Sequence, residues 1–471
     1  MSQTSIKKNF AYKSILTIST YIMGFIVFPY ISRVFGVDRL GLVNFAENTI
    51  NYFLLFASMG IAVLGVREIA AVKDDYNARN RVFSNVLGVN LLFTLVTLII
   101  YFVLIALVPK LNQSSELFYI GSAKILFTTF LIEWFYTGIE NFKYITIRSI
   151  IIKLLYVLLV FLLVREKEDY IIYFALTIGI VVLNACVNML YARRYIRIVP
   201  SELFNLKYLK NNVTLGIYSI MTSMYLTFNV MYLGFVTNNT QVGYYTTAFK
   251  LYAVILGFFS AFTHVMLPRM SALLAEDNKE RFQELANRSF STMVLFCIPL
   301  ILCSIVAAPQ IIYVLSGAGY EGAILPMRII MPAILCVGIA QVLAVQILMP
   351  MKKDKVLLNT SIFVSIMSVV LNFIIVDKLQ SVGSAIVMLS AEIVATLLYV
   401  RYVILKLKYR FSWYYILCSI FLSMPSACCC YIITDKIPNP YVSLPISMAV
   451  SVAIWMLLLM LFGKRLNVKL K

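Results

Sequence analysis

The chain has 471 residues, of which 61% are hydrophobic and 13% are charged, and its net charge at pH 7 is +19. A soluble core cannot bury that much apolar surface, so the composition excludes a soluble globular domain and predicts an integral membrane protein. The eight cysteines lie in apolar runs without the spacing of a metal site or a disulfide framework, which indicates small packing residues.

Apolar runs of about 20 residues recur along the chain, and each can cross about 30 Å of bilayer hydrocarbon as a helix. In chain order the predicted helices span residues 10–31, 41–65, 84–108, 117–138, 149–164, 170–192, 212–236, 243–268, 290–314, 324–349, 356–376, 381–404, 412–434 and 441–462. The connections are short and polar. The prediction is an all-α integral membrane protein with about fourteen transmembrane helices.

Lysine and arginine divide unevenly between the two ends of these helices. If the N-terminus is cytoplasmic, 30 of the 40 basic residues fall at cytoplasmic ends and eight at outer ends, while Lys124 and Lys250 lie inside helices. This positive-inside pattern predicts that both termini are cytoplasmic. It also accounts for the net charge, so no nucleic-acid partner is predicted.

The chain contains an internal repeat. A shift of 202 residues aligns residues 41–70 with residues 243–272 without a gap, and eight of the 30 positions are identical, including Arg67 with Arg269. Six predicted crossings separate the copies, so both run through the membrane in the same direction.

A parallel repeat predicts two six-helix lobes around a central cavity that holds the substrate. The helix count puts the first lobe at residues 1–210 and the second at 211–410. Residues 411–471 are then an additional helix pair.

Three stretches carry a family resemblance. They are NFAYKSILTISTYIMGFIVFPYISRVFGVDRLGLVNFA near the N-terminus, EWFYTGIENFKYITIRSI at 133–150, and VGYYTTAFKL followed by LPRMSALLAE from residue 242. They resemble the corresponding segments of Wzx-type polysaccharide flippases, which transport O-antigen or capsule repeat units. These flippases are related to MurJ-type lipid II flippases and MATE transporters in the MOP exporter superfamily. The resemblance covers essentially the whole chain.

The resemblance implies a flippase and not an enzyme. Its substrate would be an undecaprenyl-diphosphate-linked oligosaccharide, moved by alternating access from the cytoplasmic to the outer leaflet of the bacterial inner membrane. The implied partners are this polyprenyl-diphosphate oligosaccharide, membrane lipid, a polysaccharide polymerase and a chain-length regulator. No cofactor is implied, and coupling to H⁺ or Na⁺ stays open. A MATE-like drug or cation antiporter and a MurJ-like lipid II flippase are the alternatives.

A diphosphate carries about two negative charges, and burying them unpaired is costly, so cations are the expected ligands in the cavity. Lys250 and Lys124 lie roughly 10 Å from the outer ends of their predicted helices, one in each lobe. Lys13 and Arg33 are further substrate-binding candidates, although cations at helix ends also serve as topological anchors. For Lys250 and Lys124 the alternative interpretation is a lysine that snorkels to the head groups, or one that pairs with Glu47 or Glu392 for purely structural reasons.

Carboxylates and a histidine inside helices are candidates for a coupling or counter-ion role. These are Glu47, Glu392 and His264. The candidate gate or motif residues are Glu133, Trp134, Glu140, Arg148, Arg67 and Arg269. Glu133 and Glu140 are the expected partners of Arg148. No catalytic or metal-ligating constellation is predicted.

Overall fold

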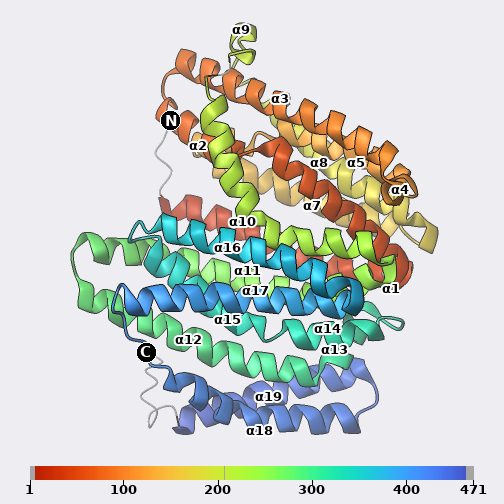
Figure 1. The fold of residues 1–471 in the computed structure, drawn as a ribbon, viewed down its shortest axis with the longest axis vertical. Helices are drawn as coiled ribbons and strands as arrows, with labels where there is room; N and C mark the ends of the chain where they lie inside the picture. The colour runs from red at the N-terminus through yellow and green to blue at the C-terminus, as the bar shows by residue number, and fades with distance from the viewer. Residues whose placement is uncertain (1–5, 206, 463–471) are drawn as a thin grey trace. The chain divides into compact units, whose positions relative to one another are not determined.

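The computed structural model describes residues 6–205 and 207–462, with the exception of some side chains inside helices. Throughout these residues the secondary structure is helical, without strands (Figure 1). By contact the chain divides into two compact units, Met1–Phe235 and Val236–Lys471.

The first unit is built around one long helix. Its elements, with the 3-10 helices marked η, are α1 (Ile6–Ser58), α2 (Ile61–Ala71), α3 (Tyr76–Leu107), α4 (Pro109–Asn112), α5 (Ser115–Thr128), η1 (Thr129–Leu131), α6 (Glu133–Gly138), α7 (Phe142–Leu163), η2 (Lys167–Asp169), α8 (Tyr170–Ala192), α9 (Pro200–Leu203) and α10 (Leu209–Val236). Helix α1 packs on α3, α5 and α7, and both α5 and α7 pack on α8 (Figure 1).

The second unit contains the remaining helices. Its elements are α11 (Asn239–Ala275), α12 (Lys279–Val306), α13 (Ala308–Ser316), the 3-10 helix η3 (Glu321–Ala323), α14 (Ile324–Ile330), α15 (Ala333–Gln341), the π-helix η4 (Val342–Leu348), α16 (Asp354–Leu371), the π-helix η5 (Asn372–Val376), α17 (Asp377–Leu405), α18 (Tyr414–Lys436) and α19 (Pro440–Phe462). Helix α18 packs on α19 and α12, and α19 packs on α13.

Within the described residues, eleven helical segments are long and apolar enough to cross a membrane. Two of them, Ile22–Ala71 and Asp354–Leu405, have 50 and 52 residues. At 1.5 Å per residue, a straight helix of either length would be roughly 75 Å long, more than twice the hydrocarbon thickness, so each segment holds more than one span. The prediction of an all-α, multi-span membrane protein is confirmed, and the count of fourteen crossings stays a prediction.

Both long segments contain a non-helical residue at the point where the sequence predicts a connection. In α1 this is Gly36, with φ 68° and ψ 174°, a conformation that glycine adopts without steric cost. In α17 it is Gln380, with φ 52° and ψ −127°. The backbone N–H and the hydroxyl of Ser381 both donate to Gln241 Oε1 of α11, at 3.3 and 2.6 Å. This anchor holds the strained turn in place.

Two helices that the sequence predicts as continuous are interrupted. The predicted helix 41–65 breaks at Met59 and Gly60, whose φ angles are 21° and 79°. The predicted helix 117–138 breaks at Ile132, with φ 39°, between η1 and α6. Apolar periodicity cannot reveal such breaks, because the residues on both sides remain apolar.

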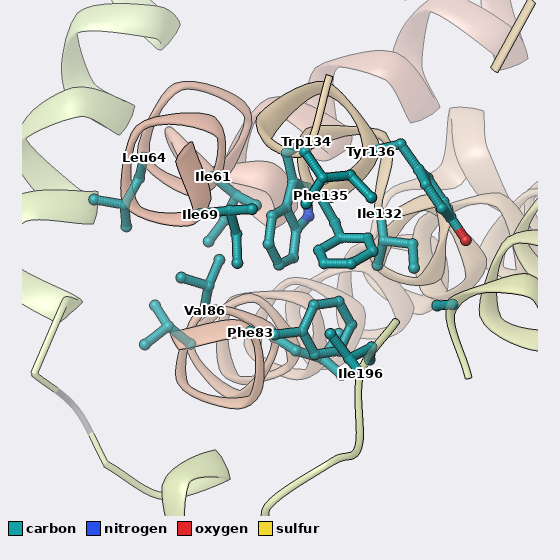
Figure 2. Close-up of a cluster of buried hydrophobic side chains, with 14 of the residues drawn as sticks. Ile61, Leu64, Ile69, Phe83, Val86, Ile132, Trp134, Phe135, Tyr136 and Ile196 are labelled. Carbon is teal, nitrogen blue, oxygen red and sulfur yellow. The ribbon is translucent and has the colours of Figure 1, made fainter. Parts of the chain in front are cut away.

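Figure 2 shows the core that holds these broken ends together. Trp134 of α6 stacks on Phe83 of α3 with ring centroids 5.3 Å apart. A Cβ atom added at Gly65 of α2 would lie 2.5 Å from Cε3 of Trp134. Helix α2 therefore approaches α6 to a distance that only glycine permits, as in close helix packing within membranes.

Candidate functional site

Lys124 of α5 meets two side chains of α1. Its Nζ donates to Asn51 Oδ1 at 2.9 Å and to Glu47 Oε1 at 3.5 Å. Glu47 and Asn51 are one helical turn apart, so they share a face of α1. The Lys124 side chain is 13% exposed and that of Glu47 is 34% exposed. An ammonium has three N–H donors. Two of those of Lys124 are used by the described residues, which leaves one for a further acceptor.

Both candidate lysines lie well inside their helices. Lys124 follows the first residue of α5 by nine positions, roughly 13 Å along the helix. Lys250 follows the first residue of α11 by eleven positions, roughly 16 Å, and is half-buried. Both helices begin before their apolar runs do, so these distances are longer than the roughly 10 Å counted from the predicted helix ends. The depth of each lysine in the bilayer stays a prediction.

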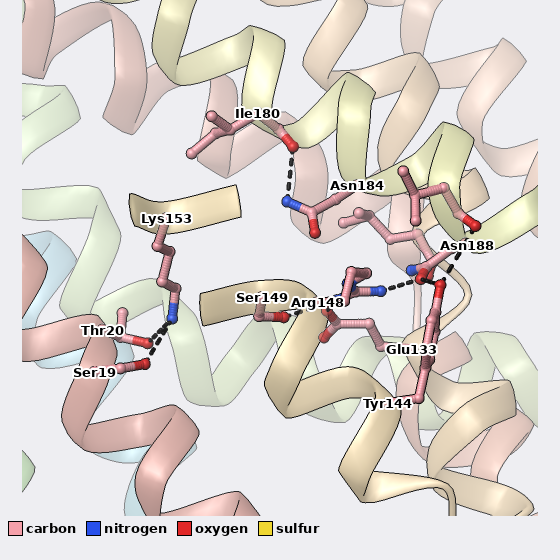
Figure 3. Close-up of polar contacts among 12 residues, drawn as sticks. Ser19, Thr20, Glu133, Tyr144, Arg148, Ser149, Lys153, Ile180, Asn184 and Asn188 are labelled. Carbon is pink, nitrogen blue, oxygen red and sulfur yellow. Dashed lines mark hydrogen bonds and ion pairs between the residues drawn. The ribbon is translucent and has the colours of Figure 1, made fainter. Parts of the chain in front are cut away.

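Arg148 of α7 is buried in a cluster of polar groups (Figure 3). Its Nη2 donates to Glu133 Oε1 at 2.8 Å and to Ser149 Oγ at 2.9 Å, and its Nη1 donates to Asn188 Oδ1 of α8. The Tyr144 hydroxyl donates to the same Asn188 oxygen at 3.1 Å. A buried guanidinium with a carboxylate and two further acceptors avoids the cost of an unpaired charge.

The other gate or motif candidates are not gathered in one cluster. Glu140 does not join Arg148, because its Oε1 accepts from Lys73 Nζ at 3.2 Å in an exposed pair. Arg67 pairs with its neighbour Glu68 at 2.8 Å. Arg269 is exposed on α11, and Trp134 is buried in the core described above.

Glu392 is the buried carboxylate of the second unit. It lies on α17, is 6% exposed, and accepts a hydrogen bond from the Tyr252 hydroxyl of α11 at 3.4 Å. Arg33 is exposed and donates to the Pro29 carbonyl one turn earlier. The side chains of the remaining two candidates, Lys13 and His264, lie outside the described part of the chain.

A small cavity of about 150 Å³, mostly apolar but with several polar groups in its wall, lies beside the broken helix ends. Glu133 and Trp134 line it, together with Asn90 and the hydroxyls of Thr94 and Thr129, which are 2.6 Å apart. Non-helical backbone at membrane depth is tolerated where it is buried in protein or lines a cavity. The break at Ile132 therefore lies in the wall of a cavity that holds some polar groups.

Hydroxyl groups continue the polar cluster beyond the end of α8. Asn141 Nδ2 donates to the Tyr195 hydroxyl at 3.2 Å, and the hydroxyls of Tyr191 and Tyr195 are 3.1 Å apart. Burial raises the pKa of Tyr195 to about 12, so this hydroxyl is neutral near pH 7.

Several residues of these sites are absent from the sequence-based candidates. They are Asn51, Tyr144, Ser149, Asn188 and Tyr252. A usable signal exists for the amides, because an asparagine within an otherwise apolar membrane helix often bonds across to another helix. Asn188 in the predicted helix 170–192 shows that pattern, whereas Asn184 donates to the Ile180 carbonyl of its own helix.

Comparison with known proteins identifies the family to which the chain belongs. A family model described as "Polysaccharide biosynthesis protein" matches residues 6–274, more than half of the chain. The chain belongs to the polysaccharide biosynthesis protein family. The Escherichia coli (strain K12) protein named "Putative O-antigen transporter" is 24% identical over 409 residues, which cover 85% of this chain and 97% of that protein.

Solved structures show that this family member has the fold of MOP superfamily transporters. The lipid II flippase MurJ, in an inward closed conformation, matches with a TM-score of 0.79 at 17% identity, covering 97% of this chain and 99% of MurJ. An inward-facing multidrug resistance MATE family transporter matches with a TM-score of 0.58 at 16% identity, covering 82% of this chain and 96% of the transporter. More of this chain therefore has a counterpart in MurJ.

Proposed function

We propose that this protein is a flippase that moves a lipid-linked polysaccharide repeat unit from the cytoplasmic to the outer leaflet of the bacterial inner membrane. The observation that carries the proposal is the sequence similarity to the E. coli protein, which extends over 97% of that protein's length. Membership in a polysaccharide biosynthesis family and eleven apolar helical segments among the described residues are consistent with it.

The substrate we propose is an undecaprenyl-diphosphate-linked oligosaccharide, with Lys124 and Lys250 as ligands of the diphosphate. Lys124 supports this role because it is held deep in α5 and retains an N–H donor beyond its bonds to Asn51 and Glu47. Glu47 then serves as the counter-ion of the empty state. When a phosphate oxygen replaces Glu47 at the ammonium, the released carboxylate is exposed enough to be hydrated.

An antiporter of cationic drugs is the second candidate, because MATE transporters share the fold. Such a transporter prefers unpaired acidic groups near its cargo. In the first unit, the carboxylate Glu47 is already within 3.5 Å of Lys124. That pairing favours an anionic substrate. Glu392 is the group we propose for H⁺ or Na⁺ coupling, since it is a buried carboxylate that accepts a hydrogen bond from the Tyr252 hydroxyl.

A complementation experiment tests the function. The chain is expressed in a strain that lacks its native O-antigen or capsule flippase but keeps the polymerase and chain-length regulator, and polymer display at the cell surface is measured. We expect display with the wild type and with Lys250→Arg, and none with Lys250→Ala at equal protein level, because a lysine acts as a point charge. Lys279→Ala is the matched control, since Lys279 is 74% exposed and pairs with Asp277, which is itself 83% exposed.

Different results would contradict the role of Lys250 and the flippase function. Normal display by a well-expressed Lys250→Ala protein would remove this lysine from the substrate site. Failure of the wild type with every repeat unit tried, together with resistance of the cells to cationic drugs, would support the antiporter.

A further inference from the structure

Helices α7 and α8 border a cavity of about 560 Å³ that none of the proposed transport residues except Arg148 reaches. On α7 it is lined at positions three to four residues apart, including Tyr144, Arg148 and Ile151, which fall on one face of the helix. Tyr191 of α8 closes the other side, and its ring stacks on that of Tyr144 with centroids 3.9 Å apart.

The end of the cavity near the start of α7 is cationic. Lys143 is exposed there, and no lining residue is acidic. Arg148 also lines the cavity, and Glu133 balances its charge, so Lys143 supplies the net positive charge. Both Nη atoms of Arg148 donate within the cluster described above, whereas its buried Nε has no hydrogen-bond partner among the described residues. That Nε is fully buried, so Lys143 is the accessible cation at this end of the cavity, which suits it to an anion.

The other end of the cavity is apolar and faces outward. Ile147 and Ile151 line it and are 46% and 60% exposed on a membrane-spanning helix, a position that faces lipid hydrocarbon. Ile151 follows Lys143 by eight residues, roughly 12 Å along α7. The cavity therefore changes from cationic to apolar over the distance from a phosphate group to the upper part of an acyl chain.

We propose that this cavity binds a resident anionic phospholipid. Its phosphate oxygens accept from Lys143 Nζ beside the guanidinium of Arg148, and one acyl chain lies along Ile147 and Ile151. Basic pockets between membrane helices bind anionic head groups in this way. A zwitterionic lipid offers the same phosphate but brings an ammonium close to Lys143, so anionic lipid is preferred. The proposal is independent of the transported substrate.

The test uses the full-length protein, purified and titrated with phosphatidylglycerol or with phosphatidylethanolamine of the same acyl chains, and native mass spectrometry counts bound lipid. We expect tighter binding of phosphatidylglycerol, and a loss of about five-fold in its affinity in Lys143→Gln. Lys207→Gln removes an exposed lysine outside the cavity and should leave the affinity unchanged. Ile151→Trp fills the apolar end and should weaken both lipids.

Three results would overturn the proposal. These are equal affinity for the two lipids in the wild type, unchanged phosphatidylglycerol affinity in Lys143→Gln, and displacement of phosphatidylglycerol by an equal concentration of undecaprenyl diphosphate. The last would assign the cavity to the head group and tail of a transported lipid instead of a resident one. Circular dichroism of each variant at the assay temperature confirms that a loss of binding is not a loss of folding.

Discussion

The ammonium of Lys124 loses most of its hydration inside α5 and regains polar contacts through Asn51 and Glu47. The contact with Asn51 is the shorter of the two, so the amide fixes the position of the ammonium while the carboxylate mainly balances its charge. Since Glu47 is about one-third exposed, water screens part of the attraction. The pair is therefore held loosely enough for an anionic group to compete for the lysine.

Removing one member of this pair should cost more than removing both. Glu47→Gln leaves a largely buried ammonium without a counter-ion and should lower stability by about 1–2 kcal/mol, a value discounted for exposure. The double variant Glu47→Gln with Lys124→Met should recover part of the loss, since no charge is then buried. Thermal unfolding in detergent measures both variants. Effects that simply add would show that the two side chains are not coupled.

Breaking the ion pair between Arg148 and Glu133 should lower stability more than breaking the pair between Lys73 and Glu140. Glu133→Gln leaves the guanidinium, 5% exposed, without its carboxylate and should lower stability by about 2 kcal/mol. Glu140→Gln removes an exposed pair and should change stability by less than about 0.5 kcal/mol. The same thermal measurement compares them. Equal losses of stability in the two variants would mean that burial does not strengthen the contribution of the Arg148 pair.

Two helix breaks in the first unit bring short helices into close contact. The left-handed residues at Gly60 and Ile132 end helical segments next to each other, and α2 and α6 then pack closely through Gly65 and Trp134. In the repeated segment, Phe262 stands where the first copy has Gly60, and α11 continues unbroken to Ala275. Glycine adopts a φ of 79° at little cost and phenylalanine does not, which favours a break in the first copy and a continuous helix in the second.

A methyl group at Gly65 should disturb this packing. Gly65→Ala places its Cβ against the Trp134 ring and should destabilise the protein by about 1–3 kcal/mol through overpacking. Gly179→Ala is the control, because a Cβ there meets nothing within 4 Å and alanine favours helix. Unfolding midpoints, together with the fluorescence of the tryptophans, report on both. An unperturbed Gly65→Ala protein would mean that α2 and α6 can separate at little cost.

At the turn around Gln380, substitution by glycine should raise stability instead of lowering it. Glycine tolerates a φ of 52° better than glutamine does, so Gln380→Gly should raise stability by up to about 1 kcal/mol, whereas Gln380→Val should lower it. Removing the anchor with Gln241→Ala should lower stability in the same direction as Gln380→Val. A destabilised Gln380→Gly protein would show that the glutamine side chain makes contacts worth more than the backbone strain.

At the scale of the whole molecule, the described spanning helices expose many large apolar side chains. Ile99, Leu107, Phe421 and Met460, for example, are more than 60% exposed on spanning helices of both units. Exposure of this kind is unfavourable in water and favourable in hydrocarbon, so the bilayer completes the burial that the protein alone does not achieve.

Topology across the membrane is the prediction that belongs to the chain as a whole. Reporter fusions after Lys210, Lys279 and Lys353 should be cytoplasmic, and fusions near Asn239 and Gly319 should be external, because basic residues concentrate at the former ends. Alkaline phosphatase and green fluorescent protein fusions measure the two sides. A cytoplasmic position for Asn239 would contradict a parallel arrangement of the two repeats.

The sequence by itself determined the membrane-spanning, all-helical class, the approximate place of every long helix, and the lysines buried within two of them. Hydropathy and charge are properties of consecutive residues, so these features can be read without coordinates. The sequence also singled out Glu133 with Arg148. It assigned Glu140 to the same arginine, and here tertiary structure decided otherwise, since Lys73 lies closer.

Only the tertiary structure paired Lys124 with Glu47 and Asn51, brought Asn188 to Arg148, and placed Lys143 at the mouth of a cavity between α7 and α8. Each of these contacts joins residues from different helices. Their proximity depends on helix rotation and on breaks such as that at Ile132, which are set by packing against neighbours. The pattern of apolar residues along one helix does not indicate which other helix packs against it.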